Sequence, residues 1–431
     1  MSAARRRFRL LLMTSDLFPP FRPAAKSIFG DEFAARGHVV DWLLRPDPRH
    51  GTEGGARPFG RGIAYVASTD TGTSRRRRFR KHWLAFVNDF RALTLVKRGG
   101  YDLVQVKDKY LGALLAIVAC KLFGVPLFYW IAFPHSESAL YNARRAFARY
   151  RWLYLLRGAL QKWTLYKVIL PSARHVFVQS EQMRRDMAAE GVPVEKMTPV
   201  PSSLNLARLD ASAGGVEKPA DERWIVYLGT LLRQRQLDFL VRVIARVIER
   251  EPAARLLFVG DGGMSADERA LLDEARRLGV EHAVTITGWL DEEQAWDYAR
   301  AADVCVSPYA PIPVLKSTSP TKLIEYMALG RPVVANVHPE QTPILLDSGS
   351  GLLSGWNEDE FAAAIVHVLE HPDEAAEMGR AGRRFVERFR THRRMADLVE
   401  ETYARVLSTD HPGTAGFNRG PRRSSLRKVL R

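Results

Sequence analysis

Residues 224–259 read WIVYLGTLLRQRQLDFLVRVIARVIEREPAARLLFV, and their pattern establishes a fold class. A short apolar run, Trp224–Leu228, opens the stretch, and a second run, Arg255–Val259, closes it. Between them, apolar residues recur every three or four positions over Leu237–Glu249, which is typical of an amphipathic helix. A strand, a helix and a strand in this order predict a right-handed crossover between two parallel strands.

The same alternation continues on both sides of this unit. Downstream we predict strands at 284–287, 304–307 and 332–335, and helices at 266–278, 292–301, 321–328 and 358–369. Upstream we predict strands at 8–13, 39–44, 103–106, 127–131 and 176–178, helices at 28–36 and 110–122, and a long loop at 51–74. The two series predict an α/β protein with two Rossmann-like, doubly wound domains that face each other across a cleft.

Composition suggests where these domains begin and end. We expect an N-terminal domain over 1–205, a polar linker over 206–221 and a C-terminal domain over 222–391. A helix at 392–410 is expected to return to the N-terminal domain. Residues 411–431 carry basic side chains and no acidic one, and we expect them to form a disordered tail.

Charge is distributed unevenly along the 431 residues. Residues 1–200 carry 34 Lys and Arg against 15 Asp and Glu, whereas residues 201–431 carry 30 against 33. A basic half beside a mildly acidic half predicts different partners for the two domains. The composition excludes a disordered, collagen-like or disulfide-stapled chain. The two cysteines, Cys120 and Cys305, form no Cys-x-x-Cys pair, so we expect no zinc site.

No segment reaches the roughly 20 consecutive apolar residues that a membrane crossing needs, and no signal peptide is recognisable. Residues 139–167, however, combine Trp and Tyr with seven basic side chains and no acidic one. Arg75–Lys81 is a second basic run. Such segments favour the headgroup region of an anionic membrane. We therefore expect a cytoplasmic protein, peripheral on the inner face of the membrane; the alternative is a solvated amphipathic helix with its aromatic side chains in the core.

Two motifs in the C-terminal half have the chemistry of phosphate binding. Gly229 and Thr230 follow a strand, where a tight turn would present amide donors to an anion, and Arg233 and Arg235 follow within reach. The alternative is a plain turn with solvated arginines.

The second motif begins at Ser319, a candidate N-cap, and Pro320 suits the first helical position. The amides of Thr321 and Lys322 would bind a second phosphate. Glu325, one turn later, would accept ribose hydroxyls. The alternative is an ordinary capped helix with an ion pair. The chain has no P-loop and no Gly-x-Ser-x-Gly elbow, which argues against those NTPases and hydrolases.

Four segments together resemble the donor domain of family 4 glycosyltransferases of GT-B architecture. They are VYLGTLLRQRQLDFL (226–240), LLFVGDGG (256–263), ITGWLDEEQAWDYARAADVCVSPY (286–309) and SPTKLIEYMALGRPVVA (319–335), in the family order. Residues 12–40 and 176–201 resemble the acceptor domain more weakly, so the resemblance implies that the domain at 1–205 binds the acceptor and the domain at 222–391 binds the nucleotide sugar. The resemblance implies a retaining transferase that uses a nucleotide diphosphate sugar, and the lack of an Asp-x-Asp motif agrees with a reaction without metal or cofactor.

The resemblance also implies roles for single residues. Gly229 would place amides at the donor diphosphate, Arg235 and Lys322 would be its two cations, and Glu325 would hold the ribose. Position 235 usually carries Lys in the family.

Other positions depart from the family pattern or are candidates by location. Thr230 stands where many members carry Arg, and Ser317 stands where the first Glu of a paired-Glu motif is expected.

His135, in FPHSES, is the candidate for the histidine that meets the donor sugar; the alternative is a loop histidine satisfied by backbone. Trp289 and Leu290 are candidates beside the base. Weaker candidates at strand ends are Lys107, Asp108 and Glu137.

Together these features predict a glycosyltransferase whose acceptor is lipid-linked or an envelope or capsule glycan. The expected partners are a nucleotide sugar, this acceptor and an anionic membrane surface. Nucleic acid is not expected, because no known binding module appears. The alternatives are a nucleotide-sugar epimerase of the same architecture, or a non-enzymatic protein that binds nucleotide sugars or nucleic acid.

Overall fold

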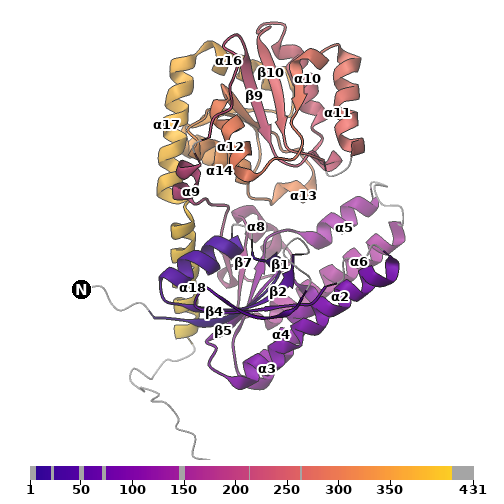
Figure 1. Ribbon diagram of the computed structural model, residues 1–431, viewed down its shortest axis with the longest axis vertical. Helices are drawn as coiled ribbons and strands as arrows, with labels where there is room; N and C mark the ends of the chain where they lie inside the picture. The colour runs from indigo at the N-terminus through magenta and orange to yellow at the C-terminus, as the bar shows by residue number, and fades with distance from the viewer. Residues whose placement is uncertain are drawn as a thin grey trace, which may run out of the picture.

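The computed structural model describes residues 6–20, 24–47, 53–69, 74–144, 151–212, 214–262 and 265–409. Within these ranges it contains two sheets flanked by helices, one above the other along the long axis of the molecule (Figure 1). The expected class, an α/β protein with two doubly wound units, is therefore confirmed. The tail expected at 411–431 lies outside the described residues.

The N-terminal sheet has the strand order β3-β4-β2-β1-β5-β6-β7-β8. Its strands are β1 (Arg9–Phe18), β2 (Val39–Pro46), β3 (Gly55–Phe59), β4 (Gly62–Val66), β5 (Leu103–Lys107), β6 (Leu127–Ile131), β7 (His175–Val178) and β8 (Met197–Pro199). Apart from the antiparallel β3–β4 pair, the strand pairs are parallel. Strands β5 and β6 are buried along their whole length, because helices cover both faces of the sheet.

The helices of this half connect the strands. They are the π-helix η1 (Ala24–Glu32), α1 (Phe33–Ala35), α2 (Arg75–Asp89), α3 (Arg91–Arg98), α4 (Tyr110–Phe123), α5 (His135–Arg144), α6 (Arg151–Thr164), η3 (Leu165–Ile169), α7 (Leu170–Ser172), α8 (Glu181–Ala189) and η4 (Val194–Lys196). The helix predicted at 110–122 is present as α4 and ends at Gly124, whose φ of 66° suits a glycine C-cap. The first predicted helix is instead largely a π-helix.

The long loop predicted at 51–74 is wrong in its central part, where β3 and β4 form an antiparallel hairpin. Strand β4 pairs with β2, and a Cβ at Gly62 would lie 2.0 Å from the carbonyl oxygen of Val40. Glycine is needed here because the two backbones approach each other closely. The glycines that suggested a loop therefore belong to a tightly packed sheet edge.

The C-terminal sheet is parallel, with the order β11-β10-β9-β12-β13-β14. Its strands are β9 (Arg223–Leu228), β10 (Ala254–Val259), β11 (Val284–Ile286), β12 (Val304–Ser307), β13 (Val333–Asn336) and β14 (Gly351–Ser354). Its helices are η5 (Arg233–Arg235), α10 (Asp238–Val247), α11 (Ser265–Leu278), η6 (Glu281–Ala283), α12 (Glu292–Ala301), α13 (Pro313–Lys316), α14 (Thr321–Ala328), α15 (Gln341–Ser348) and α16 (Glu358–Glu370). The predicted bounds of α12, α14 and β12 agree with the structure.

The chain passes between the two halves twice, and the two passages lie together. A short helix, α9 (Leu206–Ala211), occupies part of the expected linker, and its Leu209 packs in the C-terminal core. The return passage joins α17 (Pro372–Phe389) to α18 (His392–Ser408), which run beside both sheets in Figure 1. Leu204 and Thr391 form a parallel bridge, and Tyr403 of α18 donates a hydrogen bond to Gln105 of β5.

Helices α2, α5 and α6 project from the same side of the N-terminal sheet in Figure 1. In the described part of the chain, no helix combines the length and the apolar character that a membrane span requires.

Candidate functional site

The strand order of each sheet locates a crevice. In the C-terminal sheet the order reverses between β9 and β12, and in the N-terminal sheet it reverses between β1 and β5. Ligands of doubly wound sheets bind beyond the carboxyl ends of the strands at such points. The segments that follow β9, β12 and β5 contain Gly229, Lys322 and Asp108, respectively. The fold therefore brings the predicted motifs to two facing sheet edges.

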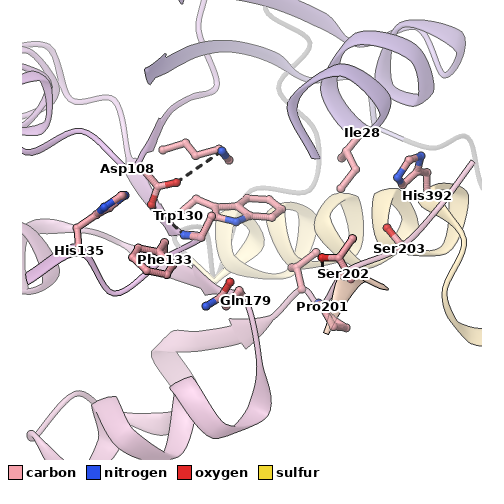
Figure 2. Close-up of a pocket in the computed structure, with 14 residues that line it drawn as sticks. Ile28, Asp108, Trp130, Phe133, His135, Gln179, Pro201, Ser202, Ser203 and His392 are labelled. Atoms are coloured by element: carbon pink, nitrogen blue, oxygen red, sulfur yellow. Dashed lines mark hydrogen bonds and ion pairs between the residues drawn. The ribbon is translucent and has the colours of Figure 1, made fainter. Parts of the chain in front are cut away.

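A cavity of about 430 Å³ lies between the two halves. The residues that line it come from both halves and from the passages between them: Ile28, Lys107, Asp108, Trp130, Ala132, Phe133, His135, Gln179, Val200, Pro201, Ser202, Ser203, Thr321 and His392. Figure 2 shows His135 and Asp108 at one end of the cavity and Ser203 and His392 at the other. Of the predicted residues, His135, Thr321, Lys107 and Asp108 thus share one space.

The floor of this cavity holds a buried cation. Lys107, at the end of β5, is 3% exposed, and its Nζ lies 3.5 Å from Asp108 Oδ2 and 3.7 Å from Asp16 Oδ2. The amide of Ala132 donates to Asp108 Oδ1 over 2.9 Å, which fixes the carboxylate at the cavity edge. A buried lysine of this kind is stabilised by its carboxylate partners. His135 is exposed, starts α5, and lies edge-on to Phe133.

The first turn of α14 carries a close ion pair. Lys322 Nζ donates to Glu325 Oε1 over 3.0 Å and to Oε2 over 2.9 Å, and the indole of Trp296 donates to Oε2 over 3.2 Å. The Glu325 side chain is 3% exposed, whereas that of Lys322 is 32% exposed. The ion pair of the alternative interpretation is therefore formed, with its carboxylate inside and its ammonium at the surface.

Arg235 ends η5, in the segment that follows the Gly229 turn. Its Nη1 donates to the Tyr227 hydroxyl over 3.4 Å, and that hydroxyl donates to the carbonyl of Thr230. Tyr227 raises the pKa of Arg235 against the opposing effect of burial. Burial raises the pKa of Tyr309, and the charge of Arg235 opposes this effect.

The glycine turn after β9 is tightly held. The Gly229 amide donates to the carbonyl of Val259 over 3.0 Å, and Gly229 adopts a φ of 152°. A Cβ at Gly260 would lie 2.2 Å from the Gly229 carbonyl oxygen. Glycine is needed at position 260 because the two backbones approach each other closely, and at position 229 because its φ is one that other residues rarely adopt. Thr230, the next residue, is exposed.

Residues 317–321 join the two halves rather than standing free. The Ser317 carbonyl accepts from the Ser180 hydroxyl over 2.6 Å and from Gln179 Nε2 over 3.2 Å. The expectation that Ser319 caps α14 is wrong, because its hydroxyl accepts from the Ser202 amide over 2.9 Å and Pro320 occupies the N-cap position. The hydroxyls of Ser202 and Thr321 lie 2.7 Å apart. The Thr321 amide, which we expected to bind phosphate, instead donates to the Ser319 carbonyl over 3.0 Å.

The remaining candidates lie elsewhere on the C-terminal half. Arg233 is exposed and lines a separate groove between α10, α11 and Tyr141, so it does not point to the same place as Arg235. Leu290 packs against the C-terminal core, whereas Trp289 is 70% exposed. In the described part of the chain, no cluster of three or more His, Cys, Asp or Glu side chains is arranged to hold a metal ion.

Sequence reasoning missed several polar residues at these edges. Trp296, Tyr227 and Ser202 contact the predicted groups only through the tertiary fold. His392 also lines the cavity, with both ring nitrogens buried and the Ser203 backbone beside the ring. The position of His392, at the start of the last helix, gave no signal in the sequence.

Comparison with known proteins places both halves in one group. A family model described as "Glycosyl transferases group 1" matches residues 222–371, and one described as "Glycosyl transferase 4-like domain" matches residues 29–202. The chain is 28% identical to D-inositol 3-phosphate glycosyltransferase of Nocardiopsis dassonvillei over 65% of each chain. It is 24% identical to alpha-monoglucosyldiacylglycerol synthase of Streptococcus pneumoniae, covering 68% of this chain and 64% of that one.

Solved structures agree in fold. Sucrose-phosphate synthase from Thermosynechococcus elongatus superimposes with a TM-score of 0.69 at 20% identity, covering 94% of this chain and 100% of that one. Anabaena HepE in complex with UDP superimposes with a TM-score of 0.64 at 14% identity, covering 92% of this chain and 100% of that one.

Proposed function

Because the chain belongs to the group 1, or family 4, glycosyltransferases and has their GT-B architecture, we propose that it transfers a sugar from a nucleotide diphosphate sugar to an acceptor hydroxyl. The observation that carries this proposal is the Lys322–Glu325 pair. It lies at the start of a helix, beside the point where the strand order of the C-terminal sheet reverses. A cation and a helix N-terminus favour phosphate there, and the carboxylate suits hydroxyl groups.

The leaving diphosphate is the group that this site has to stabilise. As the bond between the anomeric carbon and the phosphate oxygen breaks, negative charge gathers on the diphosphate. Arg235 and Lys322 would stabilise that charge, a role that a metal ion performs in other enzymes. The amides of Gly229 and Leu231 already donate to the carbonyls of Val259 and Asp261, so the expectation that this turn presents them to the diphosphate is corrected. The reaction that we propose is therefore metal-independent and retaining, and retention is supported by family membership.

The contacts of Glu325 suggest how the donor enters. An ionised carboxylate offers about four lone-pair sites. Lys322 contacts both oxygens of Glu325, and Trp296 donates to one of them, so little capacity remains for two ribose hydroxyls. In the proposed function the diphosphate attracts the partly exposed ammonium of Lys322. This movement releases carboxylate lone pairs for the ribose.

The acceptor enters from the N-terminal half. His135 lies at the cavity wall, where an imidazole can orient the donor sugar, and a phosphate oxygen takes the acceptor proton as the new glycosidic bond forms. We propose that the acceptor is lipid-linked or an envelope or capsule glycan and that the enzyme works as a peripheral protein on an anionic membrane. The relatives named above act on an inositol phosphate and on a diacylglycerol lipid.

A thermal-shift panel of nucleoside diphosphates and their sugars tests this function. A ligand at 100 times its dissociation constant stabilises a protein by about 2.7 kcal/mol, so the matching nucleotide should raise Tm clearly. The matching sugar donor should then yield a glycosylated lipid or glycan by mass spectrometry. A changed sugar formed without any acceptor would instead identify an epimerase, and no response to any nucleotide would refute the proposal.

A further inference from the structure

Two helices of the N-terminal half expose large apolar side chains. On α2 these are Phe79 and Trp83, and on α6 they are Trp152, Leu156, Leu160 and Trp163. Each of these six side chains, which we call the apolar ridge, exposes more than half of its surface to solvent. Single exposed apolar residues are ordinary, but a concentration on neighbouring turns marks an interaction surface.

The helix α6 is unusual in how little of it is covered. Gly158 is buried against Leu140 of α5, where a Cβ would lie 2.8 Å from Leu140 Cγ, and the other positions of α6 are exposed or half-buried. Close packing at this glycine joins α5 and α6 into a hairpin. The sequence of α6, RWLYLLRGALQKWT, is too apolar to face water on most of its sides without a partner.

The charges beside the ridge indicate the chemistry of that partner. The sequence of α6 contains no acidic residue, and in α2 the single one, Asp89, is buried and paired with Lys109. The basic residues with described side chains are Arg76, Arg77, Arg80 and Lys81 on α2 and Arg151, Arg157 and Lys162 on α6. A second copy of this surface would bring like charges together. Anionic lipid headgroups instead complement the cations, at about 1 kcal/mol for each one near the surface.

The hairpin also leads to the cleft. Its first residue, His135, lines the cavity between the two halves, and the chain continues from α6 into η3, where Leu165 and Ile169 are buried in the N-terminal core. A membrane contact on the hairpin would therefore hold the cavity near the bilayer surface.

We propose that α2 and the α5–α6 hairpin form a membrane-contact surface that inserts the apolar ridge into the headgroup region of an anionic bilayer. From the proposed function it then follows that the acceptor is an amphiphile, whose hydroxyl reaches the His135 side of the cleft while its apolar part stays in the membrane. Trp and Tyr favour the interfacial depth, and interfacial helices combine them with Lys and Arg.

Co-sedimentation with lipid vesicles tests the surface on the full chain. We expect the protein to sediment with vesicles of phosphatidylcholine and phosphatidylglycerol in low salt, to be released by salt, and to remain in solution with phosphatidylcholine alone. The double variant Trp152→Ser/Trp163→Ser should bind at least about tenfold more weakly, because each Trp contributes interfacial burial. Leu346→Ser on α15 of the C-terminal half removes an equally exposed apolar side chain (72% exposed) and should bind as wild type.

Charge is tested in the same assay. Arg76→Ser/Arg80→Ser should weaken binding to anionic vesicles, whereas Arg276→Ser on α11, which removes an exposed cation of the C-terminal half, should not. Equal binding of the ridge and control variants, or a dimer in size-exclusion chromatography that the Trp variants abolish, would overturn the proposal.

The hypothesis of a membrane-contact surface and the hypothesis of a transferase can fail separately, and the two failures give different results. The nucleotide thermal shift is measured without lipid. A nucleotide response without vesicle binding would refute the membrane surface and leave the transferase standing. Vesicle binding without any nucleotide response would support the surface and refute the transferase.

Discussion

Glu325 is a buried carboxylate whose charge is balanced mainly by one neighbouring side chain, Lys322. If the pair holds the donor, Lys322→Ala should lower turnover about 100-fold or more, since a single donor to a developing anion is worth that much. Glu325→Ala should also lower turnover strongly, because the ribose hydroxyls lose their acceptor. Steady-state rates at saturating acceptor would measure the loss, with circular dichroism to show that both variants fold. Lys316→Ala, which removes an exposed lysine from the neighbouring α13, should keep the wild-type rate.

The conservative variant Lys322→Arg separates charge from shape. It keeps a cation beside Glu325 and should recover part of the rate, because guanidinium also binds phosphate. Wild-type rates in both alanine variants would remove this pair from the site.

Two buried histidines should make the protein sensitive to acid. Burial lowers the pKa of His175 and of His392 from 6.5 to about 4. In the unfolded chain both take up a proton as the pH falls below 6.5, whereas in the folded chain they stay neutral until about pH 4. Stability is therefore present above pH 6.5 and is lost between pH 6.5 and 4. Each histidine should contribute a loss of roughly 2 kcal/mol between pH 8 and pH 5.

Urea unfolding at several pH values measures this loss. In the wild type the Thr198 hydroxyl lies 2.8 Å from His175 Nε2, and the side chain of His175→Gln can still bond to it. This variant should lose less stability between pH 8 and pH 5 than the wild type, by the amount that one histidine contributes. An unchanged slope in this variant would show that His175 titrates normally in the folded protein.

The residues of the site differed in how far the sequence could predict them. Lys322 and Glu325 are three positions apart on one helix, so their pairing follows from helical geometry alone. Trp296 donates to the same carboxylate from α12, and this contact depends on how α12 and α14 pack. The error at Ser319 has the same origin, because the hydroxyl expected to cap its own helix is taken by the Ser202 amide, 117 positions away.

At the scale of elements, the spacing of apolar residues and the length of the apolar runs predicted most of the helices and strands. The helix at Glu292–Ala301 begins at Asp291 with a reciprocal capping box with Gln294, a signal that is local and therefore visible in the sequence. The β3–β4 hairpin was missed because the burial of its strands is uneven and its glycines resemble loop glycines. Gly62 of β4 lies against Val40 of β2, and the sequence around Gly62 does not show that β2 is its neighbour.

Gly62→Ala therefore tests the packing of this hairpin. The new Cβ would lie 2.0 Å from the Val40 carbonyl oxygen, so the β4–β2 pairing must shift. Overpacking of this kind costs about 1–3 kcal/mol, which should appear as a lower urea midpoint. Gly55→Ala lies on the other strand of the same hairpin, where a Cβ would meet nothing within 4 Å, and should be nearly neutral. Equal midpoints for the two variants would contradict the described approach.

At the scale of the whole molecule, α18 ties the end of the C-terminal half to the N-terminal sheet. Its Met395, Val399 and Tyr403 belong to the N-terminal core. Arg36 holds the helix from outside, since its Nη1 lies 2.8 Å from Asp397 and 2.9 Å from Glu400. The arrangement of the two halves therefore depends on contacts more than 350 positions apart in the sequence.

Arg36→Met should loosen this attachment without touching the nucleotide site. Removing one partner from a largely buried ion pair costs about 3–5 kcal/mol, because Glu400, 8% exposed, loses the guanidinium and keeps the His38 ring, 3.5 Å away. The double variant Arg36→Met/Glu400→Gln also removes the most buried of the three carboxylates that contact Arg36, which are Glu32, Asp397 and Glu400, and should recover part of the loss. Calorimetry gives the stabilities, and the nucleotide-induced rise in Tm should persist in both proteins. Equal losses in the single and double variants would show that the ion pair does not hold α18, since the stranded carboxylate is the cause of the expected difference.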